Sequence, residues 1–288
     1  MGCVSDPDLE PITLPVLDVA LALAGARLLG LISDTHGFHA RDAVEYFVEA
    51  TGVDALLVAG DLEDYRGYGL PTVFIRGNNE SLPVLEELRL GTRRPPGLRY
   101  LPDGERLSIA GHEVAAVGGK WGPAGSTSGR HIDPAQVEAL VAGPRPGIVV
   151  SHESPLDVPD HDVNDPRLAD ACRAIKPRLW VSGHRHRYIT GEIDGTAVVG
   201  LGNHPHGWAT IEIEPGRLGD VRRFVPADPG YGDRLEGWMA AKAREAALLQ
   251  ELQRRPGRRR LVYGVTEPDN EHARRWFAGL SGSGDGRD

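Results

Sequence analysis

Cysteine is scarce in this 288-residue sequence, which contains only Cys3 and Cys172. Two cysteines so far apart provide neither a disulfide framework nor the paired spacing of a cysteine zinc site. A chain of this kind is typical of a reducing compartment. We therefore expect a cytoplasmic protein without structural disulfides.

The sequence also lacks an apolar run long enough to cross a membrane. Residues 12–32 are apolar on average, but Pro15, Asp18 and Arg27 interrupt them, and a membrane span needs about 20 nearly uncharged residues. The first residues do not match a myristoylation signal, because Asp6 stands where that pattern has Ser or Thr. We expect a soluble protein with no membrane partner.

Positive charge is not in excess, because 41 Asp and Glu residues outnumber 32 Lys and Arg residues and give a formal net charge of −9. This balance argues against nucleic acid as the partner. The dense basic cluster at residues 254–260 lies near the C-terminal end, so it does not form the basic groove that a nuclease needs.

Alternating apolar runs and helical patterns predict an α/β fold made of two sheets flanked by helices. We divide the chain into a lead-in at 1–26, a domain at 27–230, a helical C-terminal extension at 231–280 and a disordered tail at 281–288. The β-α-β-α-β order of the first half favours a parallel sheet. Residues 98–119 carry hairpin signals, and 187–193, 196–201 and 208–214 read as further strands.

Five of the apolar runs end in a side chain that can bind a metal. The runs at 28–32, 55–59, 72–76, 147–150 and 178–181 lead into Asp34 and His36, Asp61, Asn78, His152, and His184 and His186, respectively. In open α/β sheets the ligand crevice lies outside the carboxyl ends of the strands. Five such ends therefore predict one shared site.

Seven oxygen and nitrogen ligands exceed the needs of one ion and suit two divalent ions that share a carboxylate. Imidazole, carboxylate and amide ligands favour Mn²⁺, Fe or Zn²⁺ over Ca²⁺ or Mg²⁺. We expect two ions, with Mn²⁺ as the first choice and Fe or Zn²⁺ as alternatives.

Taken in chain order, these motifs resemble the signature of the calcineurin-like metallophosphoesterase family. The motifs, which span about residues 27–214, are Asp34-Thr35-His36, Gly60-Asp61, Gly77-Asn78-Asn79-Glu80, Ser151-His152 and Gly183-His184-Arg185-His186. The resemblance implies a four-layer α/β/β/α sandwich, here with a helical C-terminal extension, and a dinuclear site between the sheets. It also implies that Asp34, His36 and His186 bind one metal, that Asn78, His152 and His184 bind the other, and that Asp61 bridges them. The implied reaction is in-line attack on phosphorus by a metal-bound hydroxide.

The sequence departs from the family at Asn79, where the family has a histidine near the leaving-group oxygen. An amide donates a hydrogen bond but supplies no proton at neutral pH. A branch of the family with small phosphodiesterases also lacks this histidine, so we expect a phosphodiesterase of small or nucleotide-like substrates. His204 is our first choice for the proton donor, ahead of His206, His39 and His131.

Further charged residues have expected roles around the same site. We expect Arg130 to bind a non-bridging phosphate oxygen, with Arg66 and Arg76 as alternatives. We expect Glu80 and Glu153 to orient the histidine ligands as hydrogen-bond acceptors.

Three alternative functions stay open at this point. A phosphomonoesterase has the same ligands, and Asp64-Tyr65-Arg66-Gly67 echoes the Asp-Arg-Gly stretch of protein phosphatases with one residue inserted. A non-catalytic scaffold of the same fold is the third alternative, although all seven ligand positions are filled.

The long helix expected at 235–252 could join two copies of the chain into a homodimer.

Overall fold

The computed structural model describes residues 19–37, 40–123, 126, 128–157, 166–228 and 230–254. The tail predicted at 281–288 lies outside these residues, as do most of the predicted lead-in, the end of the predicted helical extension, and His39. The statements below concern the described residues.

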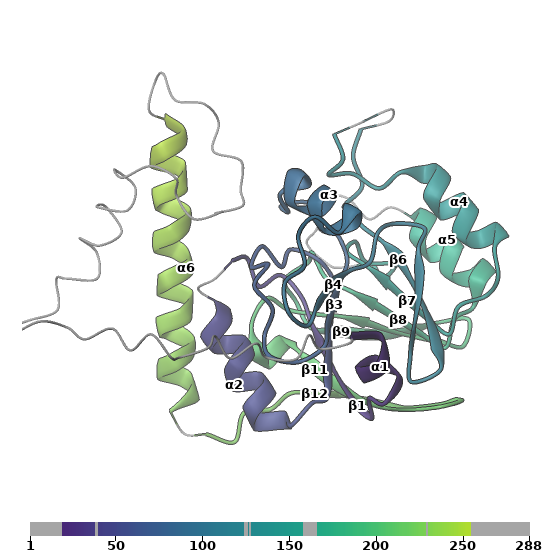
Figure 1. Ribbon diagram of the computed structural model, residues 1–288, viewed down its shortest axis with the longest axis horizontal. Coiled ribbons are helices and arrows are strands. Elements are labelled where there is room, and N and C mark those ends of the chain that lie inside the picture. Colours follow the sequence, from purple (N-terminus) through teal and green to yellow (C-terminus); the bar gives the residue numbers. More distant parts are fainter. Residues whose placement is uncertain are drawn as a thin grey trace, which may run out of the picture.

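Two six-stranded sheets face each other and form the two inner layers (Figure 1). The first sheet has the order β12, β11, β1, β2, β3, β4, with bounds Arg217–Arg223, Ala209–Glu214, Leu28–Ile32, Ala55–Val58, Thr72–Phe74 and Leu98–Tyr100. The second has the order β5, β6, β7, β8, β10, β9, with bounds Arg106–Ile109, His112–Val117, Ile148–Ser151, Leu179–Ser182, Thr196–Gly200 and Ile189–Ile193.

Helices cover the outer faces of both sheets and complete the four layers. The helices are α1 (Val19–Ala24), α2 (Arg41–Thr51), α3 (Leu82–Leu90), α4 (Pro134–Ala142), α5 (Pro166–Ile175) and α6 (Tyr231–Arg254), with a short 3₁₀ turn at Pro205–Gly207. Residues of α2 and α3 share a buried cluster with the first sheet, and residues of α4 and α5 share one with the second. The four-layer α/β/β/α fold predicted from the sequence is confirmed.

The central strands are apolar on both faces because each lies between two packed layers. In β2, Leu57 points into the core between the sheets, whereas Leu56 and Val58 point to the layer of α2 and α3. This alternation follows from the two-residue period of a strand. It explains why these strands read as continuous apolar runs.

Strand register brings the ends of the ligand-bearing strands to one level. The parallel strands β1, β2 and β3 align Ile32 with Val58 and Val58 with Phe74. In the second sheet, parallel β7 and β8 align Ser151 with Ser182. The loops after all five strands therefore leave the sheets at the same edge.

The structure differs from the sequence-based expectation in three respects. Both sheets are mixed, because β11 runs antiparallel to β1 and β5 runs antiparallel to β6. Only β5 and β6 form the hairpin expected within 98–119, while β4 pairs with β3 in the other sheet. The strand β12 was not expected, because its sequence is polar and it lies at a sheet edge.

The helix α6 packs against α2 through aromatic side chains near its N-terminal end (Figure 1). Tyr231 stacks on Tyr46 with ring centroids 5.8 Å apart, and Trp238 lies 5.9 Å from the same ring. The C-terminal helical extension is thus present to Arg254. In the part of the chain that the structure describes, no helix has the length and apolarity to cross a membrane.

Replacing Gly30 by alanine should destabilise the fold, because β1 passes close to its neighbours at this point. An added Cβ would lie 2.7 Å from Leu56 Cδ2 and 2.9 Å from Phe47 Cε1. Overpacking of this kind costs about 1–3 kcal/mol. Urea unfolding should show this loss for Gly30→Ala but not for Gly25→Ala, whose Cβ meets nothing closer than 3.8 Å. Equal stability of the two variants would refute the packing argument.

Candidate metal centre

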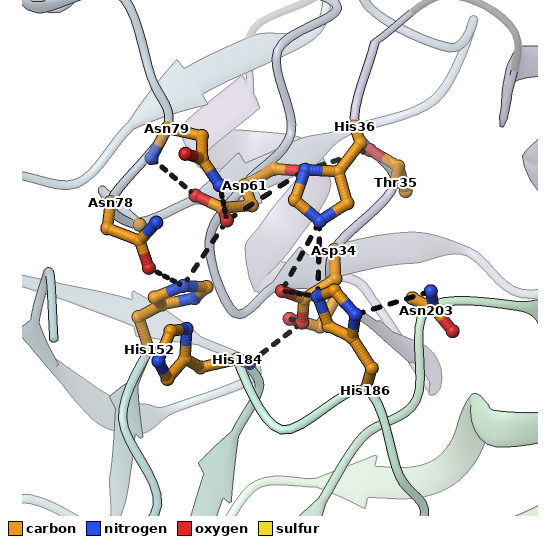
Figure 2. Close-up of polar contacts among 12 residues, drawn as sticks. Asp34, Thr35, His36, Asp61, Asn78, Asn79, His152, His184, His186 and Asn203 are labelled. Atoms are coloured by element: carbon orange, nitrogen blue, oxygen red, sulfur yellow. Dashed lines mark hydrogen bonds and ion pairs between the residues drawn. The ribbon is translucent and has the colours of Figure 1, made fainter. Parts of the chain in front are cut away.

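The seven expected ligands come together at the shared edge of the two sheets (Figure 2). Asp34 and His36 follow β1, Asp61 follows β2 and Asn78 follows β3, so four ligands come from the first sheet. The second sheet supplies the others, with His152 after β7 and His184 and His186 after β8. Side chains that lie far apart in sequence thus share one site.

Asp34, His36 and His186 form the first ligand cluster. Asp34 Oδ1 lies 3.2 Å from His186 Nε2 and 3.8 Å from His36 Nε2. The two Nε2 atoms lie 3.2 Å apart. One ligand atom from each residue lies within 4.8 Å of the others, so the cluster could hold a metal ion. Two imidazole nitrogens and a carboxylate oxygen suit an ion that accepts mixed nitrogen and oxygen ligands.

His152 is the centre of the second cluster. Its Nδ1 lies 2.8 Å from the Ala59 carbonyl oxygen, to which it can only donate. This bond directs Nε2 toward Asn78 Oδ1 at 3.2 Å and Asp61 Oδ2 at 3.5 Å. The His184 ring lies beside the His152 ring, with centroids 4.9 Å apart (Figure 2).

Asp61 lies between the two clusters. Its Oδ2 is 3.5 Å from His152 Nε2 in the second cluster. A carboxylate oxygen of Asp61 also lies within 4.8 Å of one of Asp34, which belongs to the first cluster. Asn79 holds the carboxylate in place, because its backbone N–H donates to Oδ1 at 2.8 Å and its side-chain amide donates to Oδ2 at 2.7 Å. This placement suits a carboxylate shared by two ions.

Glu63 is a site residue that the sequence analysis missed. Its Oε1 accepts a hydrogen bond from His36 Nδ1 at 2.8 Å, which leaves Nε2 as the free ligand atom of that ring. The sequence signal that could have identified it is its position two residues after Asp61, just as His36 stands two residues after Asp34. Glu63 also adopts a left-handed backbone conformation, with φ +57°.

The two glutamates expected to orient histidines have different surroundings. Glu80 instead accepts hydrogen bonds from the backbone N–H groups of Gly77 at 2.6 Å and Leu62 at 3.1 Å, so it joins two ligand loops. Glu153 pairs with Arg185 at 2.7 Å, and its other oxygen lies 3.9 Å from His184 Nε2.

Backbone strain is concentrated at the ligands. Asp34, His36, Asp61, His184 and His186 all have positive φ values, between +51° and +64°. This conformation costs roughly 1–2 kcal/mol for a residue with a Cβ. Such strain persists where the surrounding structure enforces it and is typical of functional sites.

Glycines in the motifs allow the ligand loops to approach one another. A Cβ at position 77 would lie 2.1 Å from Asp61 Oδ1, and a Cβ at position 183 would lie 1.9 Å from Ser33 Oγ. Gly77 and Gly183 are therefore required by packing around the carboxylates of Asp61 and Asp34, since any side chain there would collide with them.

The family comparison agrees with this geometry. Residues 28–212 match the calcineurin-like phosphoesterase superfamily domain. The chain belongs to this family. A curated relative, the lariat debranching enzyme of Schizosaccharomyces pombe, is 21% identical over 216 residues, which cover 53% of this chain and 47% of the relative. The chain therefore matches only about half the length of that relative.

A solved structure also supports the fold of this calcineurin-like phosphoesterase. The protein TT1561 of Thermus thermophilus is similar with a TM-score of 0.51 and 18% sequence identity, over 69% of this chain and 99% of that chain. At this identity the likeness supports the fold alone.

Buried charges in the phosphoesterase site shift one another's pKa values. Burial lowers the pKa of His152, but the charge and hydrogen bond of Asp61, together with the charges of Asp34 and Glu80, raise the pKa to about 10. Burial raises the pKa of Asp61, but the charge and hydrogen bond of His152 lower it below its usual range. Burial and the charge of His152 lower the pKa of His184 to about 3. Neutral His184 is therefore ready to bind a cation at neutral pH.

The other expected site residues lie at different distances from the ligands. Arg130 is at the site, because its Nη1 donates to the Asn78 carbonyl oxygen at 2.7 Å. His204 stacks on His206 with centroids 5.9 Å apart, and the preceding Asn203 lies 3.5 Å from His186 Nδ1. Neither contact tests the expected role of His204 as a proton donor.

The two alternative arginines have structural partners. Arg66 forms two hydrogen bonds with Asp64, at 2.8 and 2.9 Å. Arg76 is buried and donates to Asp103 Oδ2 at 2.5 Å and to the Gly118 carbonyl oxygen at 2.9 Å. Arg76 is thus committed to joining loops, and Arg130 is better placed to contact a substrate.

Glu63→Gln should weaken metal binding about 10- to 100-fold, because a neutral amide is a poorer partner for the Nδ1–H of His36. Chelator competition with Mn²⁺ would measure the change. Glu49→Gln, at an exposed position of α2, is the matched control and should bind Mn²⁺ like the unmodified protein. Equal affinities for both variants would show that Glu63 does not orient a ligand.

Metal affinity should rise with pH. The metal-free protein carries a proton on His152 at neutral pH, since its pKa is raised to about 10. Binding of an ion through Nε2 requires that this proton leave, so one released proton makes the apparent affinity rise about tenfold for each pH unit. Calorimetric titration with Mn²⁺ in buffers of different ionisation enthalpy would count the released protons. Affinity that stays constant from about pH 6.5 to 8.5 would contradict this view of His152.

Proposed function

We propose that this calcineurin-like phosphoesterase is a metal-dependent phosphodiesterase that hydrolyses small or nucleotide-like phosphodiesters at a dinuclear centre. The observation that carries the proposal is the position of Asp61 close to both Asp34 of the first ligand cluster and His152 of the second. A phosphomonoesterase or protein phosphatase is the alternative that the same ligands allow.

The residues present fit two divalent ions. In the proposed centre, Asp34, His36 and His186 would hold one ion, Asn78, His152 and His184 would hold the other, and Asp61 would contact both. Such ions supply Lewis acidity, which lowers the pKa of water and withdraws charge from phosphoryl oxygens. Mn²⁺ is the proposed ion, with Fe or Zn²⁺ as alternatives, because the ligands mix imidazole with oxygen donors.

Arg130 is the proposed substrate clamp. One N–H of its guanidinium is fixed to the backbone of Asn78, which holds the group beside the ligands. The remaining N–H groups can donate to a non-bridging phosphate oxygen, a contact that is stronger for charged partners. The clamp would orient phosphorus for in-line attack and stabilise charge that develops on its oxygens.

Asn79 donates two hydrogen bonds to Asp61, one from its backbone N–H and one from its side-chain amide, and thereby keeps that carboxylate charged and oriented. We propose that it stabilises the site in this way and that His204 supplies the proton to the leaving group. The preference for a diester rests on the absence of a histidine at position 79.

Catalysis is preferred over a scaffold role for three reasons. All seven ligand positions carry side chains that bind metals, and their ligand atoms converge (Figure 2). A curated relative of the chain is named as an enzyme, the lariat debranching enzyme. A non-catalytic protein would have no need to maintain five strained ligand residues.

We further propose a small-molecule substrate, a cytoplasmic location, and no nucleic acid or membrane as partner. Self-association through α6 is also proposed, because the aromatic contacts described between this 24-residue helix and α2 come from its N-terminal part, and Met239 is half exposed.

Asp61→Ala should abolish turnover by the Mn²⁺-loaded protein. The test compares hydrolysis of bis(4-nitrophenyl) phosphate with that of 4-nitrophenyl phosphate. We expect faster turnover of the diester, and a loss of at least about 10²-fold in the variant, because a charged group at the reacting centre is removed. Asp170→Ala, an exposed position on α5, is the matched control and should keep full activity. A protein that binds two ions yet hydrolyses neither ester would refute the proposed function.

A further inference from the structure

Arg76 is a buried arginine that stands two residues before the expected ligand Asn78. The residue is 7% exposed, so its guanidinium needs hydrogen-bond partners within the protein. It donates to the backbone carbonyl oxygens of Gly118 at 2.9 Å and His131 at 3.4 Å, and to that of Gly129. One side chain thus joins the loop after β3 to two further segments of the chain.

Asp103 neutralises this buried charge. Its Oδ2 accepts a hydrogen bond from Arg76 Nη2 at 2.5 Å, and its Oδ1 accepts one from the backbone N–H of Gly118 at 2.7 Å. The carboxylate therefore holds the guanidinium and one of the segments that the guanidinium binds. A guanidinium presents its N–H donors in a rigid planar fork, which a lysine ammonium does not reproduce. The pair thus fixes the relative positions of the groups that it joins.

The chain is packed closely around this pair. A Cβ at position 119 would lie 2.7 Å from Arg76 Nη1, and a Cβ at position 118 would lie 2.5 Å from Asp103 Oδ1. Gly119 also has a left-handed backbone conformation, with φ +84°. Glycine at these two positions allows the backbone after β6 to approach the guanidinium. Such close contacts restrict the guanidinium to the observed position.

Two of the carbonyl groups that Arg76 binds belong to the neighbours of Arg130. Gly129 precedes Arg130 and His131 follows it, and the carbonyl oxygens of both accept hydrogen bonds from Arg76. The carbonyl oxygen of Arg130 itself accepts a hydrogen bond from the backbone N–H of Lys120 at 3.2 Å. The backbone on both sides of Arg130 is therefore fixed relative to the loop after β3.

The side chain of Arg130 is attached to the same loop. Its Nη1 donates to the carbonyl oxygen of Asn78 at 2.7 Å. Both the backbone and the guanidinium of Arg130 are thus fixed to the loop that carries an expected metal ligand. A group that contacts a reacting phosphate needs such a fixed position, because a misplacement of about 1 Å can cost about 10²-fold in rate.

We propose that the Arg76–Asp103 pair positions Arg130 for contact with the substrate phosphate. Arg76 and Asp103 are positioning residues, since they act through Arg130. This inference rests on the proposed function and adds the residues on which the proposed clamp depends. A phosphate oxygen at the metal centre would meet a guanidinium that is already oriented, so that binding would not have to order a flexible side chain.

The test is a double-mutant cycle with the Mn²⁺-loaded full chain. Asp103→Asn keeps the size of the side chain but removes the charge that holds Arg76. It should lower both kcat/KM for bis(4-nitrophenyl) phosphate and the affinity for inorganic phosphate about five- to tenfold, without a change in Mn²⁺ affinity. In the Arg130→Ala background the same substitution should change either quantity by less than about twofold, because the residue that the pair positions is absent.

Glu113→Gln is the matched control, since it removes a carboxylate that pairs with Arg106 at the surface, and it should leave both quantities unchanged. Arg76→Lys keeps the positive charge but loses the planar fork, so it should give the same pattern as Asp103→Asn. This second variant keeps the test valid if Asp103→Asn does not fold.

Equal losses with and without Arg130 would overturn the inference, because they would show that the pair acts on the fold as a whole. Phosphate affinity that Asp103→Asn leaves unchanged would overturn it as well. Absence of turnover by the unmodified protein would overturn the proposed function, whereas the expected pattern of phosphate affinities would still support the positioning of Arg130.

Discussion

The buried charge of Asp61 is the constraint on which the rest of the site depends. A carboxylate that is 1% exposed needs compensation, because burial of an unpaired charge is costly. Asn79 supplies two hydrogen bonds and His152 supplies positive charge, so the loops after β2, β3 and β7 must meet at this point. That meeting requires a glycine at position 77, where a Cβ would lie 2.1 Å from the carboxylate. Gly77, the residue before Asn78, is therefore required by the buried charge of Asp61 on the neighbouring loop.

The sheets supply the stability that offsets the strain at the ligands. Five ligand residues occupy the left-handed region at roughly 1–2 kcal/mol each, a cost comparable to the whole stability of many domains. Three buried clusters, one between the sheets and one beneath each helical layer, hold the strand ends in register. Because the strand ends cannot move independently, the loops keep conformations that they would not adopt alone. A bound cation would relieve the repulsion between Asp34 and Asp61, which the metal-free site balances with protonated His152.

The sequence predicts those ligands of the site that directly follow an apolar strand in the chain. Asp34 and His36, like His184 and His186, stand just after apolar runs, and the register of parallel strands carries these ends to one edge. Contacts between loops could not be predicted in this way. Glu63, whose backbone is left-handed, contacts His36 from another loop, and Arg76 pairs with Asp103, 27 residues away. The strand β12 escaped notice because an edge strand faces solvent and carries no apolar signal. The segment of β4 was expected to be part of a hairpin, and its actual partner β3 was missed because strand pairing depends on tertiary contacts.

The replacement of a histidine by Asn79 has a consequence for the chemistry of the site. An imidazole at this position could hold a proton for the leaving group, whereas the amide donates to Asp61 at 2.7 Å and does not titrate. The bond to Asp61 is therefore present at every pH at which the protein is folded, and the price is the loss of an acid next to the leaving group. In the reaction proposed above, the leaving group would depart as an anion or take its proton from another side chain, for which His204 is the proposed donor. Such a reaction would depend on positioning and charge stabilisation more than on acid catalysis. Arg130 is the proposed source of both contributions, since its guanidinium is fixed beside the ligands by the bond to the backbone of Asn78.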